Sequence, residues 1–192
     1  MHSNIIASSY LANVLATDPA TVIKGYFPSA HSGLLRKVNA KIQKLFESDA
    51  VGVYRSFGTE DIITIDLNNV QRRKASSLFA EFLEQLVDKR ALESLVIRGV
   101  WVGDLIYDTY MRRYSKPTIY IGDQIFRNFL LESAELFIFW EDFFKNQNVK
   151  AVNVSHCAYN ASMPYRFAVA KNIPAYQVTA NHIYRLSNND YF

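Results

Sequence analysis

The chain has 192 residues, of which 49% are hydrophobic and 14% aromatic, and this apolar content excludes wholesale disorder and supplies a core for one domain. The net charge of +3 is too weakly basic to indicate a nucleic-acid partner. The single cysteine, Cys157, excludes an internal disulfide and a cysteine-based zinc site, and it fits a reducing, cytoplasmic compartment.

Helical and extended patterns alternate along the first half of the chain. In order, they predict a helix over 4–16, a strand over 21–27, a helix over 33–48, strands over 50–54 and 62–67, and a helix over 70–90. We expect the last of these helices to begin at Asn68 or Asn69, because an asparagine side chain accepts a backbone N–H at a helix start.

The same alternation continues in the second half. The patterns predict a strand over 95–97, a helix over 104–114, a helix over 124–146, a strand over 150–155, a helix over 161–171, a strand over 175–178 and a fraying tail over 188–192. Lys116-Pro117 ends the first helix, and Asp123 caps the second. Seven phenylalanine and tryptophan residues between 126 and 144 are interpreted as core, which makes that helix the central packing element.

This order predicts an α/β fold, namely a Rossmann-like three-layer domain with a mostly parallel sheet, formed by residues 1–192 as one domain. Such folds usually open with a strand, whereas this chain opens with a helix. Either the first strand lies upstream or the order is unusual. No stretch reaches the roughly 18 apolar residues of a spanning helix, so we expect no transmembrane segment.

The segment Val102-Gly-Asp-Leu-Ile-Tyr-Asp-Thr-Tyr-Met-Arg-Arg113 places two carboxylates and two guanidinium groups on one predicted helix. At about 100° per residue, one face is apolar and the opposite face carries Asp104, Asp108 and Arg112. One interpretation is an ordinary surface helix, in which Asp104 caps the first turn and Asp108 forms an ion pair with Arg112.

The other interpretation of this helix is that its polar face lines a ligand cleft. Gly103 would let the backbone approach a ligand, and Asp104 would accept a sugar hydroxyl or a proton. Arg112 or Arg113 would hold a phosphate.

A second polar segment begins where the strand over 150–155 ends. His156 stands just past that strand end, which is where ligands bind in open parallel sheets, and it can act as a base, an acid or a hydrogen-bond donor. Tyr159, Asn160 and Ser162 add hydroxyl and amide groups before the next helix. The alternative is that His156 is an ordinary hydrogen-bonded loop histidine.

Several common signatures are missing from the sequence. It contains no dinucleotide-binding Gly-x-Gly-x-x-Gly, no nucleotide-hydrolase phosphate loop, no esterase nucleophile elbow and no zinc-protease His-Glu-x-x-His. The remaining histidines, His2, His31 and His182, show no ligand spacing, so no metal site is expected. Cys157 has no recognisable catalytic partner and is interpreted as a small buried residue.

Five short segments occur in order over about residues 95–180: the helix motif of 102–113, Lys116-Pro-Thr118, Trp140-Glu-Asp-Phe-Phe144, Val154-Ser-His156 and Tyr165-Arg-Phe-Ala-Val-Ala170. Together they resemble bacterial surface-carbohydrate proteins of capsule and lipopolysaccharide biosynthesis. Those proteins resemble two-domain glycosyltransferases with paired Rossmann-like halves.

The resemblance implies that this chain is the N-terminal, acceptor-side half of such a transferase. It implies a glycan or lipid-linked acceptor, and a cytoplasmic protein that is peripheral at the inner membrane face. A nucleotide-activated sugar would be the co-substrate, with no covalently bound cofactor. That sugar would bind a C-terminal domain or partner chain, and the chain alone is expected to be inactive.

The resemblance also assigns site residues. From the helix motif it carries over Gly103, Asp104 and Asp108. From the strand end and the following helix it carries over Ser155, His156, Tyr165 and Arg166, while Tyr159, Arg112 and Arg113 complete the expected substrate-binding set. Asp104 or His156 would be the general base that removes a proton from the acceptor hydroxyl.

Two other functions fit the same sequence. A Rossmann-like domain of this size could be a non-catalytic carbohydrate- or nucleotide-binding module, or a subunit completed by another chain. It could also be a small α/β enzyme of another class that uses His156 and Asp104 without sugars.

Overall fold

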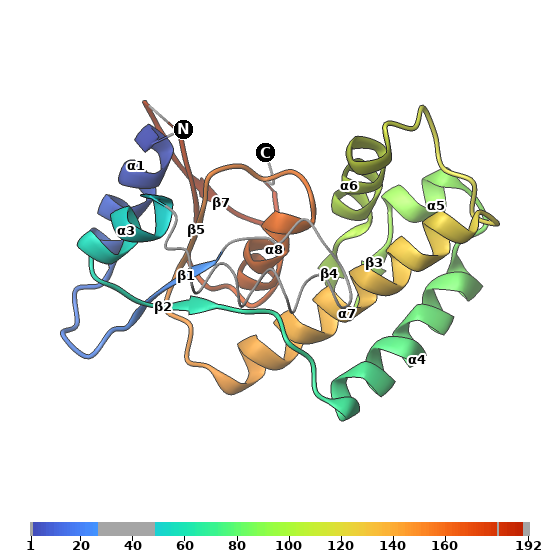
Figure 1. Cartoon of the computed structure of the whole chain (residues 1–192), viewed down its shortest axis with the longest axis horizontal. Coiled ribbons are helices and arrows are strands. Elements are labelled where there is room, and N and C mark those ends of the chain that lie inside the picture. Colours follow the sequence, from blue (N-terminus) through green and yellow to red (C-terminus); the bar gives the residue numbers. More distant parts are fainter. Residues whose placement is uncertain (1, 27–48, 180, 190–192) are drawn as a thin grey trace.

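A computed structural model describes residues 2–26, 49–179 and 181–189 (Figure 1). In chain order the elements are α1 (His2–Leu15), β1 (Ile23–Tyr26), α3 (Asp49–Ser56), β2 (Thr59–Ile63), α4 (Asn69–Gln85), α5 (Lys89–Glu93), β3 (Val96–Ile97), β4 (Val100–Trp101), α6 (Gly103–Tyr114), α7 (Gln124–Asn146), β5 (Val152–Val154), η1 (Asn160–Ser162), α8 (Met163–Ala170), β6 (Ala175–Val178) and β7 (Ile183–Leu186). The helix predicted over 33–48 lies outside the described residues.

The strands are short, and those of the described residues lie in three separate sheets. β1 pairs in parallel with β2, β3 and β4 form an antiparallel hairpin, and β5 pairs in parallel with β6, which pairs antiparallel with β7. The mixed α/β class is therefore confirmed. The described strands do not form one continuous parallel sheet, so the Rossmann-like three-layer architecture is not confirmed and stays a prediction.

Local capping signals place the helix boundaries. Asn68 and Gln71 form a reciprocal capping box at the start of α4, and the Asp123 carboxylate accepts the Ile125 backbone N–H at the start of α7. α6 ends at Ser115, which adopts the left-handed conformation just before Lys116 and Pro117. These boundaries agree with the sequence prediction.

Some predicted elements were wrong. Residues 50–54, predicted as a strand, lie in the helix α3, which packs against α1. The strand predicted over 62–67 overlaps only the last two residues of β2, which runs from Thr59 to Ile63. The helix predicted over 70–90 is two helices, because α4 ends at Gln85 and Asp88 caps α5. The strands β4 and β7 were not predicted.

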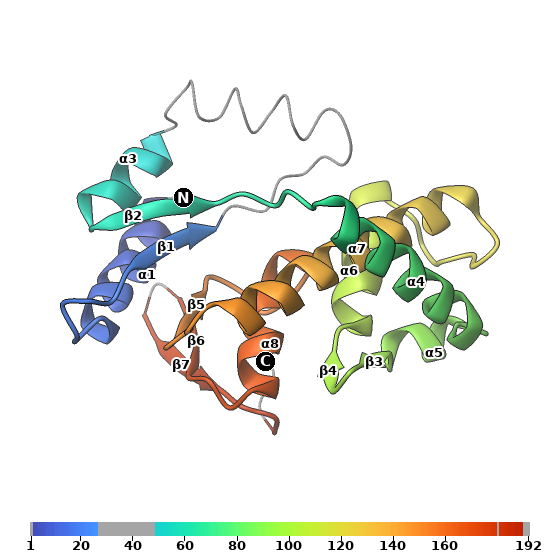
Figure 2. The ribbon, with the colours of Figure 1, turned by 90° about the horizontal axis from the view of Figure 1, so that it is seen from below.

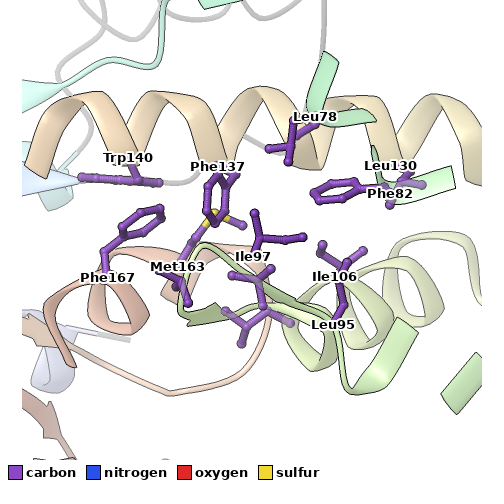
Figure 3. Close-up of a cluster of buried hydrophobic side chains, with 14 of the residues drawn as sticks. Leu78, Phe82, Leu95, Ile97, Ile106, Leu130, Phe137, Trp140, Met163 and Phe167 are labelled. Atoms are coloured by element: carbon purple, nitrogen blue, oxygen red, sulfur yellow. The ribbon is translucent and has the colours of Figure 1, made fainter. Parts of the chain in front are cut away.

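The long helix α7 organises the core, as the sequence predicts. α4 runs along one side of it, and α8 packs against it nearer its C-terminal end (Figure 2). Figure 3 shows Phe137 and Trp140 of α7 pointing toward Met163 and Phe167 of α8. The same cluster continues through these residues to Leu78 and Phe82 of α4, Ile97 of β3, and Ile106 of α6, all of them buried.

Across the described ranges, no helix combines the length and the apolar character needed to cross a membrane.

Candidate functional site

A buried ion pair joins the polar motif of α6 to α8, the helix that follows the second polar segment. Arg166 on α8 donates from Nη2 to Oδ2 of Asp104 on α6 at 2.5 Å. The Arg166 side chain is 0% exposed and that of Asp104 is 15% exposed. The Arg166 guanidinium also lies 4.4 Å from the ring centroid of Trp101 and 5.0 Å from that of Tyr165. A cation in this position is held by one carboxylate and two aromatic faces.

The pKa values of both α6 carboxylates, Asp104 and Asp108, are raised. Burial raises the pKa of Asp104 above its usual range, and the Arg166 guanidinium opposes that rise. Burial, followed by the nearby Glu93 carboxylate, raises the pKa of Asp108. Because Arg166 occupies one carboxylate oxygen of Asp104 and the other is buried, Asp108 is the α6 carboxylate that a solute reaches.

Two hydrogen bonds from Asn160 hold η1 against two helices. The Asn160 backbone N–H donates to Oγ1 of Thr109 on α6 at 2.7 Å, and Nδ2 of Asn160 donates to Oγ of Ser133 on α7 at 3.1 Å. Thr109 and Ser133 donate in turn to carbonyl oxygens of their own helices. The start of η1 is therefore fixed against both α6 and α7.

The segment of residues 155–162, the 155–162 loop, is also closed on itself. The Ser162 hydroxyl lies 2.6 Å from the carbonyl oxygen of His156 and 2.8 Å from that of Ala158, and it donates to them. Nδ1 of His156 lies 3.4 Å from the same hydroxyl oxygen. The Ser162 hydroxyl therefore ties the start of the loop to its end, next to the His156 ring.

Tyr159 in this loop has φ 69° and ψ 162°, a backbone region that only glycine adopts without strain. Its ring contacts the Arg112 guanidinium, which lies 4.6 Å from the ring centroid. The His156 and Tyr159 rings also meet edge to face, with centroids 5.9 Å apart. Arg112, Ser155 and His156 are exposed, and Tyr159 is half-buried. We call these four residues and Asp108 the α6–loop surface.

Other predicted site residues lie away from this surface. Arg113 donates to Glu132 at 2.7 Å and lies over the Phe129 ring, both on α7. The side chains of the two arginines of the motif therefore have different partners: Arg112 contacts Tyr159, and Arg113 contacts Glu132. Tyr165 is fully buried, so neither it nor Arg166 can contact a solute directly in this structure.

Three expectations for the helix motif were wrong. Asp104 does not cap α6, whose N-cap Val102 has no side-chain capping bond. Gly103 is buried, and its backbone approaches protein instead of a ligand, because an added Cβ would lie 1.8 Å from the Leu92 carbonyl oxygen. Within the part of the chain that the structure describes, no ion pair joins Asp108 to Arg112.

Sequence reasoning missed Trp101, Thr109 and Ser133. Trp101 donates from its ring N–H to the Glu93 carbonyl oxygen at 2.8 Å and shields Arg166. Trp101 lies two residues before Gly103, at the start of the helix motif, and this position could have indicated that it belongs to the site. Thr109 and Ser133 carry no such signal, because each looks like an ordinary small polar residue within a helix.

The remaining candidate groups are structural. The Cys157 thiol is buried, and burial raises its pKa to about 11, so it is protonated near neutral pH. In residues 2–26, 49–179 and 181–189, no three His, Cys, Asp or Glu side chains gather as a metal site requires.

Comparison with known proteins gives no relative, since no family model, curated protein or solved structure matches this chain. Its function is therefore inferred from the geometry of the site.

Proposed function

We propose that this chain is the acceptor-side domain of a glycosyltransferase of bacterial surface-polysaccharide assembly, and that the acceptor binds the α6–loop surface. One observation carries the proposal. Two polar segments about 50 residues apart in sequence are joined by the Thr109–Asn160 bond and the Arg112–Tyr159 contact. The Asp104–Arg166 pair joins the first of them to α8, which follows the second. In this proposal the chain is one Rossmann-like half, and the nucleotide-activated sugar binds a further domain or a partner chain.

The geometry favours His156 over Asp104 as the general base. Oδ2 of Asp104 is occupied by Arg166, whereas His156 is exposed. In the transfer step, an acceptor hydroxyl gives its proton to Nε2 while its oxygen forms a bond to the anomeric carbon of the donor. The bond from that carbon to the phosphate oxygen breaks, and the nucleoside diphosphate leaves with the electron pair.

Asp104 and Arg166 then act as positioning residues. Their ion pair fixes α8 against α6, and α8 follows directly from the loop that carries His156. Asp108, one turn beyond Asp104 and exposed, accepts hydrogen bonds from sugar hydroxyls.

Calorimetric titration with a panel of capsule and lipopolysaccharide oligosaccharides tests the proposal. We expect at least one glycan to bind, and Asp108→Asn to weaken that binding about tenfold, as expected for a hydrogen bond to a charged group. Asp66→Asn, which changes an exposed aspartate before α4, is the matched control. Absence of binding to any glycan, or equal weakening by both variants, contradicts the proposal.

Catalysis needs a separate test, because the donor site lies elsewhere. When the donor-binding half is supplied, transfer should fall at least about a hundredfold in His156→Ala. It should be unchanged in His182→Ala, which removes an exposed histidine near β7. Equal activity of the two variants would exclude His156 as the base.

A second candidate is a binding subunit without catalysis, completed by another chain. Ile6, Tyr10 and Val14 lie at every fourth position along α1 and are 46%, 65% and 53% exposed, whereas Ser8 and Ser9 are buried. An apolar stripe facing outward favours a partner surface. This candidate predicts glycan binding that His156→Ala leaves intact, and no transfer with any donor-binding half.

A further inference from the structure

The α6–loop surface contains a compact group of exposed hydrogen-bond donors. Arg112 lies over one side of the Tyr159 ring, and His156 meets the same ring edge to face. Ser155 is exposed beside His156 in the chain. Tyr159 therefore contacts both a guanidinium group and an imidazole ring. Arg112 forms no ion pair with any carboxylate in the described part of the chain, so its charge is available to a ligand.

The loop that presents these groups is held in place at a conformational cost. A tyrosine at φ 69° and ψ 162° is strained. The bonds from Asn160 to Thr109 and from Asn160 to Ser133 fix the loop on one side of Tyr159. The bonds from Ser162 to the His156 and Ala158 carbonyls fix it on the other side. Strain that is retained against such a cost is a feature of ligand sites.

We propose that Arg112, which lies over the Tyr159 ring, and Ser155 bind a phosphate ester, so that the acceptor of the proposed transfer reaction carries a phosphate. This inference rests on the proposed function, whose acceptor it specifies. A guanidinium fork fits two phosphate oxygens, and the Ser155 hydroxyl supplies a further hydrogen bond. A single guanidinium with few further donors fits one phosphate group and not a nucleic-acid backbone.

The neighbouring carboxylate gives the proposal a distinctive signature. Asp108 lies one turn before Arg112, about 6 Å along the helix axis. Its negative charge opposes a bound phosphate but favours a sugar hydroxyl. Sugar and phosphate are therefore expected to occupy opposite ends of the α6–loop surface, with the sugar near Asp108 and the phosphate near Arg112.

The test is calorimetric titration with inorganic phosphate, glucose 1-phosphate and glucose at low ionic strength. We expect both phosphates to bind, with affinity that falls as salt is added. Arg112→Gln should weaken phosphate binding at least about tenfold. Arg127→Gln, at an exposed arginine of α7, should leave it unchanged. Equal affinity of wild type and Arg112→Gln for inorganic phosphate would overturn the inference.

Asp108→Asn should act in the opposite direction and tighten inorganic phosphate binding about twofold to threefold, because a repelling charge is removed. A merely structural role of α6 would weaken binding in both variants. Unchanged or weaker phosphate binding in Asp108→Asn contradicts the proposed arrangement. Circular dichroism spectra that match wild type show that each variant is folded.

The outcomes separate this inference from the proposed function. If unphosphorylated glycans bind as tightly as their phosphorylated forms, the inference fails and the acceptor domain stands. If inorganic phosphate binds through Arg112 but no glycan binds, the phosphate site stands and the proposed function fails. Vesicles of phosphatidylcholine with and without phosphatidic acid show whether the bound phosphate belongs to a lipid or to a soluble molecule. Arg112-dependent binding only to the vesicles with phosphatidic acid supports a lipid phosphate, whereas binding only to glucose 1-phosphate supports a soluble one.

Discussion

Tyr159 is the residue at which backbone strain can be measured directly. An alanine at φ 69° and ψ 162° remains strained, whereas glycine does not, so Tyr159→Gly should be more stable than Tyr159→Ala by about 1–2 kcal/mol. At the exposed strand residue Tyr184 the order should reverse, because glycine normally costs about 1 kcal/mol relative to alanine. Urea unfolding of the four variants gives both differences. The same order at both positions would show that Tyr159 is unstrained.

Arg166 is the residue on which the buried charge of Asp104 depends. Arg166→Leu leaves a carboxylate without its counter-charge and should lower the free energy of unfolding at neutral pH by about 3 kcal/mol. The pKa of Asp104, already raised by burial, rises further when the guanidinium is lost. A raised carboxyl pKa means that the folded state holds its proton more tightly than the unfolded state does.

The stability loss in Arg166→Leu should therefore depend on pH. It should be smallest at acid pH, where Asp104 is protonated in both folded proteins. It should grow as the pH rises from the pKa of Asp104 in folded wild type to the higher pKa of Asp104 in the folded variant. Denaturant curves at several pH values measure this. Adding Asp104→Asn to Arg166→Leu should remove most of the pH dependence. A deficit that is constant across pH would show that the lost stability is packing alone.

At the scale of elements, the N-terminus of α6 is positioned by a close backbone approach. A Cβ on Gly103 would lie 1.8 Å from the Leu92 carbonyl oxygen, so Gly103→Ala should lower stability by about 3 kcal/mol. Gly52 in α3 has nothing within 4 Å of an added Cβ, and Gly52→Ala should be neutral or stabilising by up to about 1 kcal/mol. Thermal unfolding compares the two. Equal effects would show that α5 and α6 are not in close contact at Gly103.

The elements that the sequence predicted well carry their own signals. α4 and α7 begin at asparagine and aspartate caps, and α6 ends before Lys116-Pro117. Residues 50–54 include two valines and a tyrosine, which favour strands, but they pack on α1 as a helix. β7 shows no alternation, since three of its four residues are exposed, and only pairing with β6 defines it.

The site was predictable in its segments but not in its contacts. The sequence placed Asp104 and His156 in polar segments next to predicted elements, and the structure packs those segments together. It could not reveal that Arg166 neutralises Asp104 from 62 positions away, because no local pattern encodes that pairing. It also could not separate Arg112 from Arg113, whose side chains diverge to Tyr159 and Glu132.

At the scale of the whole molecule, one cluster of buried residues connects the three sheets through α7. Unfolding should therefore be a single transition. Phe137 lies beside Phe167 at the centre of the cluster, and Phe137→Ala should lower the free energy of unfolding by about 3–5 kcal/mol. Single-tryptophan variants test whether the whole molecule unfolds together. In Trp140→Phe the fluorescence comes from Trp101, near α6, and in Trp101→Phe it comes from Trp140, near β1. Fluorescence midpoints for the two reporters, each compared with circular dichroism of the same variant, should coincide. Separate midpoints would show two independently folding parts.

The central claim is that α6 and the 155–162 loop form one ligand surface. Amide chemical shifts in a nuclear magnetic resonance titration with glucose 1-phosphate test it most directly. We predict that amides of residues 108–113 and 155–162 shift together with one dissociation constant, while those of α1 and His182 do not. Shifts confined to one of the two segments, or clustered elsewhere in the chain, would contradict the account.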